Sequence, residues 1–202
     1  MDARRVIDEL SGILGRFLDA GGGDWSRAVE AVADAVGGCH KILVFGNGGS
    51  AAQAQHFAAE LVNRFMRDRR PVPAMALTTD TSCLTAIGND SDFGLVFSRQ
   101  VEAHGQPGDV AIGLTTSGGS ANVIAALRVA RAKGLVTVAL TGEAGLRTKG
   151  AAAATATESE GRSGTGLVDY LLAVPSASTP RIQEVHLVLL HLLAEEIENR
   201  LG

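Results

Sequence analysis

Two glycine-rich loops in the sequence have the composition of anion-binding sites. The first is Gly46-Asn47-Gly48-Gly49-Ser50, which follows an apolar run at 41–45 and precedes a helical pattern. Glycine lets backbone N–H groups approach an anion, and the helix dipole favours negative charge at this position. A dinucleotide fingerprint would need a glycine in place of Ala51. The loop therefore predicts phosphate or sugar binding, with a plain turn as the alternative.

A second loop repeats this arrangement. Thr115-Thr116-Ser117-Gly118-Gly119-Ser120 lies between an apolar run at 110–114 and a helical pattern at 119–133. Hydroxyl groups at a helix start can be simple caps, but their combination with two glycines favours a phosphate cradle. A nucleotide P-loop would end in Gly-Lys-Ser/Thr, so we expect the phosphate of a small metabolite. Asn89-Asp90 is either a third polar edge of this site or an ordinary turn.

Several side chains near these loops could move protons. His56 and Glu60 are four residues apart in a helical pattern, so they share one helix face. Gln183, His186 and His191 lie in the apolar C-terminal segment. A carboxylate and imidazoles beside a phosphate suit proton transfer at a carbon next to a carbonyl, or a metal site. The alternatives are histidines satisfied in the core and a solvated glutamate, because the sequence does not place the two helices in contact.

Arginines follow this helical pattern at Arg64, Arg67, Arg69 and Arg70. Cations are favourable near the C-terminus of a helix, and the helix predicted over 50–66 ends in this region. We therefore interpret the arginines as charges at a helix end, with attraction of an anionic substrate as the alternative.

The composition excludes several classes of protein. The 202 residues are 46% hydrophobic and 20% charged, which excludes a disordered chain. A net charge of −4 and 4% aromatic residues argue against nucleic-acid partners. No apolar stretch is long enough to span a membrane and the chain begins with a charged amphipathic segment, so we expect a soluble, cytoplasmic protein without a membrane partner. Cys39 and Cys83 lack metal or disulfide spacing and are expected to be buried, reduced thiols.

Short apolar runs alternate with helical patterns along the chain. The apolar runs lie at 41–45, 72–77, 110–114, 136–140 and 171–174, and the helical patterns at 50–66, 92–103, 119–133 and 182–201. A continuous apolar run is typical of a strand buried on both faces. We predict an α/β fold over 1–202, a doubly wound, flavodoxin-like sheet of about five parallel strands flanked by helices. Ligands bind beyond the carboxyl ends of such strands, where both polar loops would lie.

The N-terminal segment 1–37 is expected to form two helices outside the α/β core at 38–180. Apolar spacing from Ile7 onward predicts the first helix, which Gly21-Gly22-Gly23 would end. Asp24 can cap the second helix.

Two later segments depart from the alternation of strands and helices. Residues 142–168 are rich in Gly, Ala, Ser and Thr, and we expect a short helix within a long connection there. The C-terminal helix expected at 181–202 is apolar around most of its circumference. We therefore expect it to pack against another subunit.

Taken together, these motifs resemble the sugar isomerase (SIS) domain family, and within it the phosphoheptose isomerases. The resemblance spans nearly the whole chain in order and is carried by 46–51, 55–61, 88–90, 115–123, 181–186 and His191. Three positions depart from the usual family pattern and affect how the substrate is positioned. Gln53 replaces Asp, Thr115 replaces Ser and Gly119 replaces Asn.

The resemblance implies an aldose–ketose isomerase that converts D-sedoheptulose 7-phosphate to D-glycero-D-manno-heptose 7-phosphate through an enediol. This is the first step of nucleotide-activated heptose biosynthesis for bacterial surface glycans. The resemblance also implies a homotetramer with active sites at subunit interfaces, Glu60 and His191 as catalytic residues, and Zn²⁺ in each subunit. The implied zinc ligands are His56, Glu60, Gln183 and His191. The implied substrate-binding residues are Asn47, Gly48, Gly49, Ser50, Glu60, Asn89, Asp90, Thr115, Thr116, Ser117, Ser120 and Gln183.

Two other functions fit the same fold. A non-catalytic SIS protein would bind a protein partner of the replication-initiator type, but such relatives lack the acid and base found here at Glu60 and His191. An isomerase or sensor for another phosphosugar fits the phosphate loops equally well. Only the matches at 56–60 and 183–191 argue against that second alternative.

Overall fold

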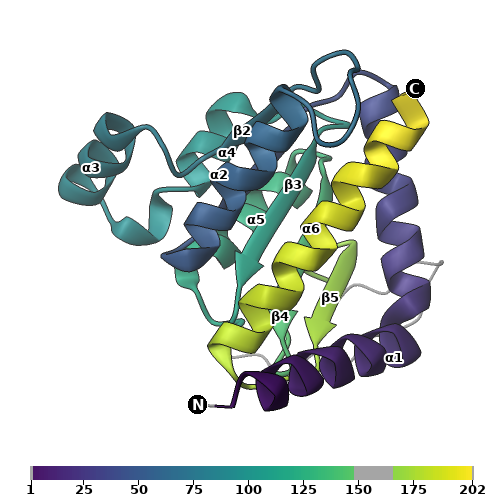
Figure 1. Cartoon of the computed structure of the whole chain (residues 1–202). Helices are drawn as coiled ribbons and strands as arrows, with labels where there is room; N and C mark the ends of the chain where they lie inside the picture. The colour runs from purple at the N-terminus through teal and green to yellow at the C-terminus, as the bar shows by residue number, and fades with distance from the viewer. Residues whose placement is uncertain (1, 148–165, 202) are drawn as a thin grey trace.

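The fold is built on a parallel β-sheet. The computed structural model describes residues 2–147 and 166–201 (Figure 1). Within these residues, five parallel strands pair in the order β2-β1-β3-β4-β5. They are β1 (Ile42–Gly46), β2 (Ala74–Ala76), β3 (Val110–Thr115), β4 (Val136–Gly142) and β5 (Tyr170–Val174). The predicted doubly wound α/β fold is confirmed, and a strand lies at each of the five apolar runs.

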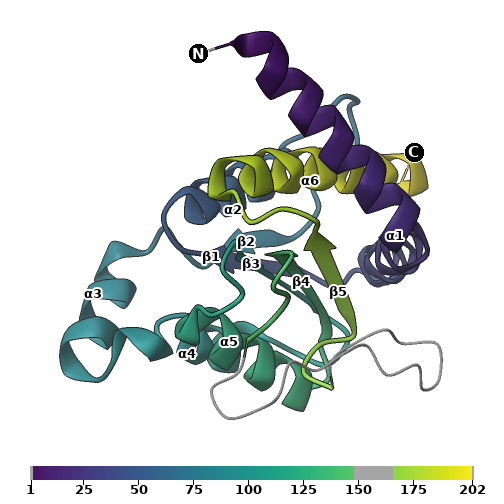
Figure 2. The same cartoon turned by 90° about the horizontal axis from the view of Figure 1, so that it is seen from below.

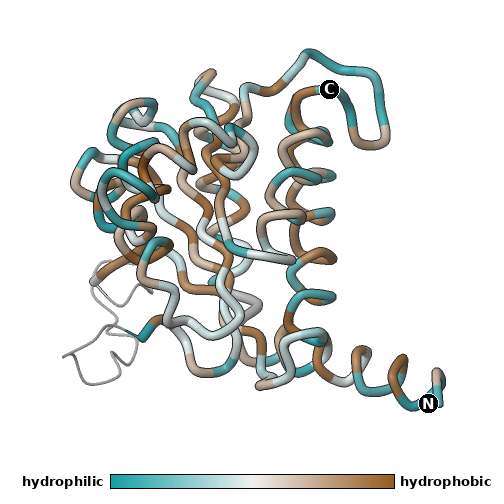
Figure 3. The backbone as a smooth tube through the Cα atoms, turned by 90° about the vertical axis from the view of Figure 1, so that its left-hand side faces the viewer, coloured by the Kyte–Doolittle hydropathy of each residue, from teal (hydrophilic) through white to brown (hydrophobic). Residues whose placement is uncertain are grey.

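Helices cover both faces of the sheet (Figure 2). On one face lie α1 (Ala3–Gly37), α2 (Gly49–Val62) and α6 (Thr179–Leu201), and on the other lie α4 (Ser98–His104) and α5 (Ala121–Ala132). Successive residues of β1 belong to different apolar clusters, Val44 to the first face and Leu43 to the second. The strands are therefore apolar at most positions rather than at alternate ones. Figure 3 shows these hydrophobic stretches in the middle of the fold.

The N-terminal segment forms one helix rather than two. α1 runs without a break over 35 residues, so the predicted stop at Gly21-Gly22-Gly23 and the cap at Asp24 are wrong. Glycine costs a helix roughly 1 kcal/mol per residue relative to alanine but does not forbid it. Side chains on both sides of the glycines, Phe17 and Ala28 among them, are buried in the same core cluster. The ribbon changes direction along α1 (Figure 1), and glycine is a common cause of such a bend.

A helix that the sequence patterns do not predict, α3 (Thr81–Asp90), extends away from the sheet (Figures 1 and 2). None of its side chains is fully buried, and its apolar face is short: Leu84 and Ile87 are partly buried against the core. The carboxylate of Asp80 caps it by accepting a hydrogen bond from the backbone N–H of Cys83. α3 contacts the short 3₁₀ helix η1 (Phe93–Leu95), which precedes α4 within the predicted helix at 92–103.

The C-terminal helix α6 is covered largely by its own chain. It packs against α1, α2 and β4, and its buried side chains recur at helical spacing from Ile182 to Glu198. Leu192, which is 43% exposed, is a large apolar side chain of α6 that remains accessible. The apolar circumference is thus mostly explained within one chain, and packing of α6 against another subunit stays a prediction.

Neither cysteine is buried, contrary to expectation. Cys39 is exposed just after α1, and Cys83 is half-buried in the projecting helix α3. Both thiols are free, as expected. Cys39 has a φ of 63°, and this left-handed conformation at a helix end is the one that usually selects glycine.

Two further expectations concern membrane-spanning helices and the segment 142–168. Across residues 2–147 and 166–201, no helix is long and apolar enough to cross a membrane. The short helix expected within 142–168 falls mainly on residues 148–165, which lie outside the described part of the chain.

Candidate functional site

The two polar loops begin at neighbouring strand ends. β1 and β3 pair directly, with Gly46 opposite Leu114, so the loops that follow them emerge side by side. This is the place where the strand order reverses, which is the usual ligand site of an open parallel sheet. Asn47 and Asn122 join the loops through two reciprocal amide hydrogen bonds of 2.9 Å. Asn122 is 4% exposed, and its role as the partner of Asn47 is not visible in the sequence.

Hydroxyl groups line the second loop, as predicted. The Oγ1 of Thr115 and the Oγ of Ser120 lie 2.9 Å apart, so the strand end is tied to the start of α5. The Oγ of Ser117 accepts a hydrogen bond from the N–H of Gly119 at 3.2 Å. Gly118 has a φ of 66°, and a Cβ atom there would lie 1.6 Å from the carbonyl oxygen of Gly145. Only glycine fits this close approach of two backbones.

An arginine outside the sequence motifs, Arg147, lies beside this loop. The backbone N–H of Arg147 donates a 2.8 Å hydrogen bond to the backbone carbonyl of Gly118. A Cβ atom built on Gly119 would lie 3.6 Å from Nη2 of Arg147. The Arg147 side chain is exposed and forms no ion pair with a described carboxylate. A cation is therefore available at the rim of the hydroxyl-lined loop.

The predicted acid–base residues of α2 and α6 meet. The Nε2 atoms of His56 and His191 lie 2.8 Å apart, and their rings are edge to face. Nδ1 of His56 lies 3.7 Å from Oε1 of Glu60, one turn further along α2. Glu60 and His56 are partly exposed, with side-chain exposures of 24% and 44%. The cluster therefore holds a carboxylate and two imidazoles within reach of a ligand.

Gln183 links the start of α6 to the start of α2. A Cβ atom on Gly49 would lie 2.6 Å from Nε2 of Gln183, so the amide rests on the first loop. The side-chain Nε2 of Gln53 donates a 2.6 Å hydrogen bond to the backbone carbonyl of Gln183. An ionised Asp, the usual family residue at position 53, could not donate this bond. Gln183 thus lies at the first polar loop, and within the described residues no hydrogen bond joins it to the imidazole pair.

His186 is a core residue rather than an acid–base group. It is fully buried, and its Nε2 donates to the carbonyl of Thr141 at 3.2 Å. Burial lowers the pKa of His186 from 6.5 to about 4, although the hydrogen bond to Thr141 opposes this shift. The imidazole is therefore neutral at physiological pH.

Asn89 and Asp90 are not brought to the loops within one chain. They end the projecting helix α3, where the amide of Asn89 donates a 2.7 Å hydrogen bond to Asp90. Both side chains are exposed. A role in this site would require another chain to supply them.

The predicted metal ligands do not surround a common point in this arrangement. Among residues 2–147 and 166–201, no group of three or more His, Cys, Asp or Glu side chains is placed to hold a metal ion. His56 and His191 face each other directly, and Gln183 lies at Gly49. His56, His191 and Glu60 nonetheless offer donor types that zinc accepts, imidazole nitrogen and carboxylate oxygen.

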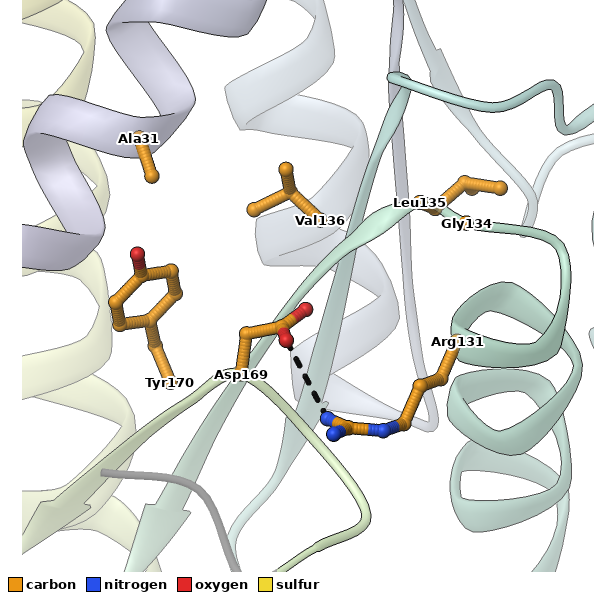
Figure 4. Close-up of a pocket in the computed structure, with 7 residues that line it drawn as sticks. All are labelled: Ala31, Arg131, Gly134, Leu135, Val136, Asp169 and Tyr170. Atoms are coloured by element: carbon orange, nitrogen blue, oxygen red, sulfur yellow. Dashed lines mark hydrogen bonds and ion pairs between the residues drawn. The ribbon is translucent and has the colours of Figure 1, made fainter. Parts of the chain in front are cut away.

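A separate cavity of about 400 Å³ lies at the amino-terminal ends of the strands, where β4 and β5 begin (Figure 4). Asp169 and Arg131 line it and form an ion pair of 3.3 Å. The other oxygen of Asp169 accepts hydrogen bonds from the N–H and the hydroxyl of Thr137. These charges hold strand ends together, and the predicted site lies at the other end of the strands.

Comparison with known proteins agrees with the sequence motifs. The SIS domain family matches residues 7–142. The phosphoheptose isomerase of Geobacter sulfurreducens is 51% identical over 172 residues, which cover 85% of this chain and 82% of the relative. The structure of phosphoheptose isomerase from Neisseria gonorrhoeae is 40% identical, with a TM-score of 0.79 and coverage of 97% and 96%. That of a phosphoheptose isomerase from Francisella tularensis is 31% identical, with a TM-score of 0.81 and the same coverage. The chain is a SIS-domain protein and belongs to the phosphoheptose isomerase family.

Proposed function

We propose that this protein isomerises D-sedoheptulose 7-phosphate to D-glycero-D-manno-heptose 7-phosphate. The observation that carries the proposal is the contact of His56 with both His191 and Glu60, at the edge of the sheet that bears the two polar loops. A non-catalytic SIS protein would not need this acid–base cluster. Membership of the phosphoheptose isomerase family is the reason for proposing this particular substrate.

The chemistry requires a proton to leave one carbon of the sugar and return to its neighbour through an enediol. Glu60 is the proposed base, because its carboxylate is accessible and lies beside imidazoles that can exchange protons. His191 is the proposed partner in these transfers. A positioned acid or base typically contributes roughly 10²–10⁴-fold to the rate.

The phosphate of the substrate is assigned to the loops after β1 and β3. Backbone N–H groups at the start of α2, the hydroxyls from Thr115 to Ser120, and the amide of Gln183 offer hydrogen bonds to it. Asn89-Asp90 would be supplied by a neighbouring chain. This supports a homotetramer with active sites between subunits, since no side chain of α3 is fully buried and Phe93 beside it is 59% exposed. Two free thiols fit a reducing compartment such as the cytoplasm.

We also propose that His56, Glu60, Gln183 and His191 hold a zinc ion. The nitrogen and oxygen donors fit zinc, which would act as a Lewis acid on the carbonyl oxygen of the substrate. We expect metal analysis to find zinc in purified protein, chelation to remove it together with activity, and a His56→Gln variant to bind it more weakly. Full activity of the metal-free protein would instead make His56 a structural residue.

The direct test of the function is an isomerase assay. Purified protein incubated with sedoheptulose 7-phosphate should form the aldose 7-phosphate, detected by chromatography and mass spectrometry. Other ketose phosphates of five or six carbons serve as controls for an isomerase of different specificity. No turnover of any sugar phosphate, with or without added zinc, would favour the partner-binding alternative.

Arg147 provides a test of where the phosphate binds. Replacing Arg147 with Gln removes the cation beside Gly118 and Gly119, which pairs with no carboxylate of residues 2–147 and 166–201. A charge-assisted hydrogen bond contributes about 1.5–3 kcal/mol, so KM should rise about 10-fold or more with kcat nearly unchanged. Arg128→Gln, an exposed arginine on α5, is the matched control and should leave KM unchanged. Equal KM values for both variants would remove Arg147 from the phosphate site.

A further inference from the structure

A buried ion pair holds the segment that follows α2. Glu198 of α6 and Arg69 have side chains only 2% exposed, with Nε of Arg69 3.3 Å from Oε1 of Glu198. The Glu198 carboxylate also accepts hydrogen bonds from the backbone N–H groups of Phe65, Met66 and Arg67, at 2.8, 2.9 and 3.1 Å. Burial alone would raise the pKa of Glu198, but these N–H groups and Arg69 outweigh burial and lower the pKa. The carboxylate is therefore ionised at neutral pH.

Arg69 fastens the same segment to the end of α2. Its Nη1 donates a 2.7 Å hydrogen bond to the carbonyl of Leu61, and its Nη2 donates a 2.7 Å bond to the carbonyl of Glu60. These carbonyls belong to the last turn of α2, where no helical N–H is left to pair with them. For Arg69, the interpretation of the arginine run as helix-end charges is confirmed.

The segment 65–69, which this ion pair holds, contacts both proposed catalytic residues, His191 and Glu60. The ring of Phe65 stacks on the ring of His191, with centroids 5.4 Å apart and an angle of 29° between the planes. Glu60 is the residue whose carbonyl Arg69 binds. Glu198 lies seven residues after His191, about two turns along the same helix. The contact between the α2 and α6 side chains is therefore bounded by Glu198 and Arg69 at one end and by the Gln53–Gln183 hydrogen bond at the other.

We propose that Glu198 and Arg69 are positioning residues for the proposed isomerase reaction: they fix the backbone of 65–67 so that Phe65 holds His191 in place against His56, which in turn contacts Glu60. A buried ion pair is a costly way to join the segment after α2 to α6, and apolar side chains would do it as well. A carboxylate is needed to accept three successive backbone N–H groups and so to set the path of the segment. The inference rests on the proposed function, because it assigns a task to residues placed in that site.

The test compares Glu198→Gln with Glu196→Gln. The first change keeps the shape of the side chain, removes its charge and turns an N–H₂ group toward backbone N–H groups. Glu196 lies on the same helix, is 42% exposed and pairs only loosely with Arg200 at 3.9 Å. We expect Glu198→Gln to lower kcat about 10-fold or more with KM within about twofold, because small displacements of reacting groups are costly. Glu196→Gln should match the original protein.

Phe65→Leu separates positioning from a general loss of stability. It removes the aromatic face on His191 and leaves the charges of Glu198 and Arg69 in place. We expect it to lower kcat in the same way, and the double variant with Glu198→Gln to be no slower than the slower single variant, since both changes act through the same contact. Multiplied effects would overturn the proposal. If Glu198→Gln does not fold, an unchanged kcat in Phe65→Leu overturns it.

A spectroscopic readout keeps this test independent of the reaction. Because the ring of Phe65 stacks on His191, we expect it to shift the NMR resonance of the His191 Cε1–H group, which a His191→Gln variant assigns. Glu198→Gln should move or broaden this resonance and leave that of the exposed His104 in place. An unmoved His191 resonance overturns the proposal even if activity falls. Should the original protein fail to isomerise sedoheptulose 7-phosphate, the proposed function fails while this measurement still decides the positioning.

Discussion

Glu60→Gln should reduce kcat for sedoheptulose 7-phosphate by about 10²–10⁴-fold. The amide keeps the size of the side chain but cannot take a proton from carbon. The Glu60 carboxylate lies 3.7 Å from Nδ1 of His56, and both side chains are partly exposed, so the free energy of unfolding should change by less than about 1 kcal/mol. Turnover and incorporation of solvent deuterium into the sugar measure the loss. Circular dichroism and the oligomeric mass check that the fold is kept.

The control for this variant is Glu102→Gln. Glu102 is exposed on α4, on the opposite face of the sheet from α2, so its replacement should not affect turnover. The zinc content of Glu60→Gln is measured as well, because Glu60 is also a proposed ligand. Lost turnover with normal zinc assigns Glu60 as the base, whereas normal turnover would place the base elsewhere.

The local parts of this site follow from sequence periodicity. The spacing of four residues between His56 and Glu60 fixes them on one face of α2 whatever else the chain does. Likewise, apolar runs followed by glycine and hydroxyl residues place both polar loops at strand ends. Each of these signals involves residues that are fewer than ten positions apart in the sequence. Over that range, the backbone geometry of a helix or strand decides where side chains lie.

The long-range parts do not follow from the same signals. The contact between His56 and His191 joins residues 135 positions apart, and it depends on how α2 and α6 pack on one face of the sheet. Glu198 looks like one more surface charge in a helix with several, and only the packing shows that it is buried. α3 escapes prediction for a different reason, because its apolar face is limited to a few partly buried side chains such as Leu84 and Ile87 and gives only a weak periodic pattern.

His186 shows what sequence periodicity predicts for one residue and what long-range packing adds to it. Its position in an apolar helix suggests a core residue, and the structure adds the strength of the constraint. Nε2 donates to the Thr141 carbonyl, so Nδ1 is left unprotonated, and no described group pairs with it. Protonation would place a second N–H and a positive charge in a site without an acceptor.

The stability of the protein should therefore fall steeply in mild acid. In the unfolded chain the pKa of His186 is near 6.5, and in the fold it is about 4. Between these values the unfolded state binds a proton that the folded state does not, so the free energy of unfolding decreases as pH falls from 6.5 to 4. The full difference corresponds to about 3 kcal/mol. Urea unfolding at a series of pH values and one protein concentration measures it.

His186→Gln isolates this contribution. Glutamine can still donate a hydrogen bond toward Thr141 but does not titrate, so its stability should depend far less on pH between 6.5 and 4.5. Asp109 and Glu198 also have lowered pKa values, because hydrogen bonds and cations outweigh the effect of burial, and they add to the loss only as pH falls toward the usual carboxylate range. His104→Gln, at an exposed position, should follow the original protein. Parallel curves for the original protein and His186→Gln would show that the imidazole is solvated before unfolding, and that the packing of α6 on β4 is looser than the structure indicates.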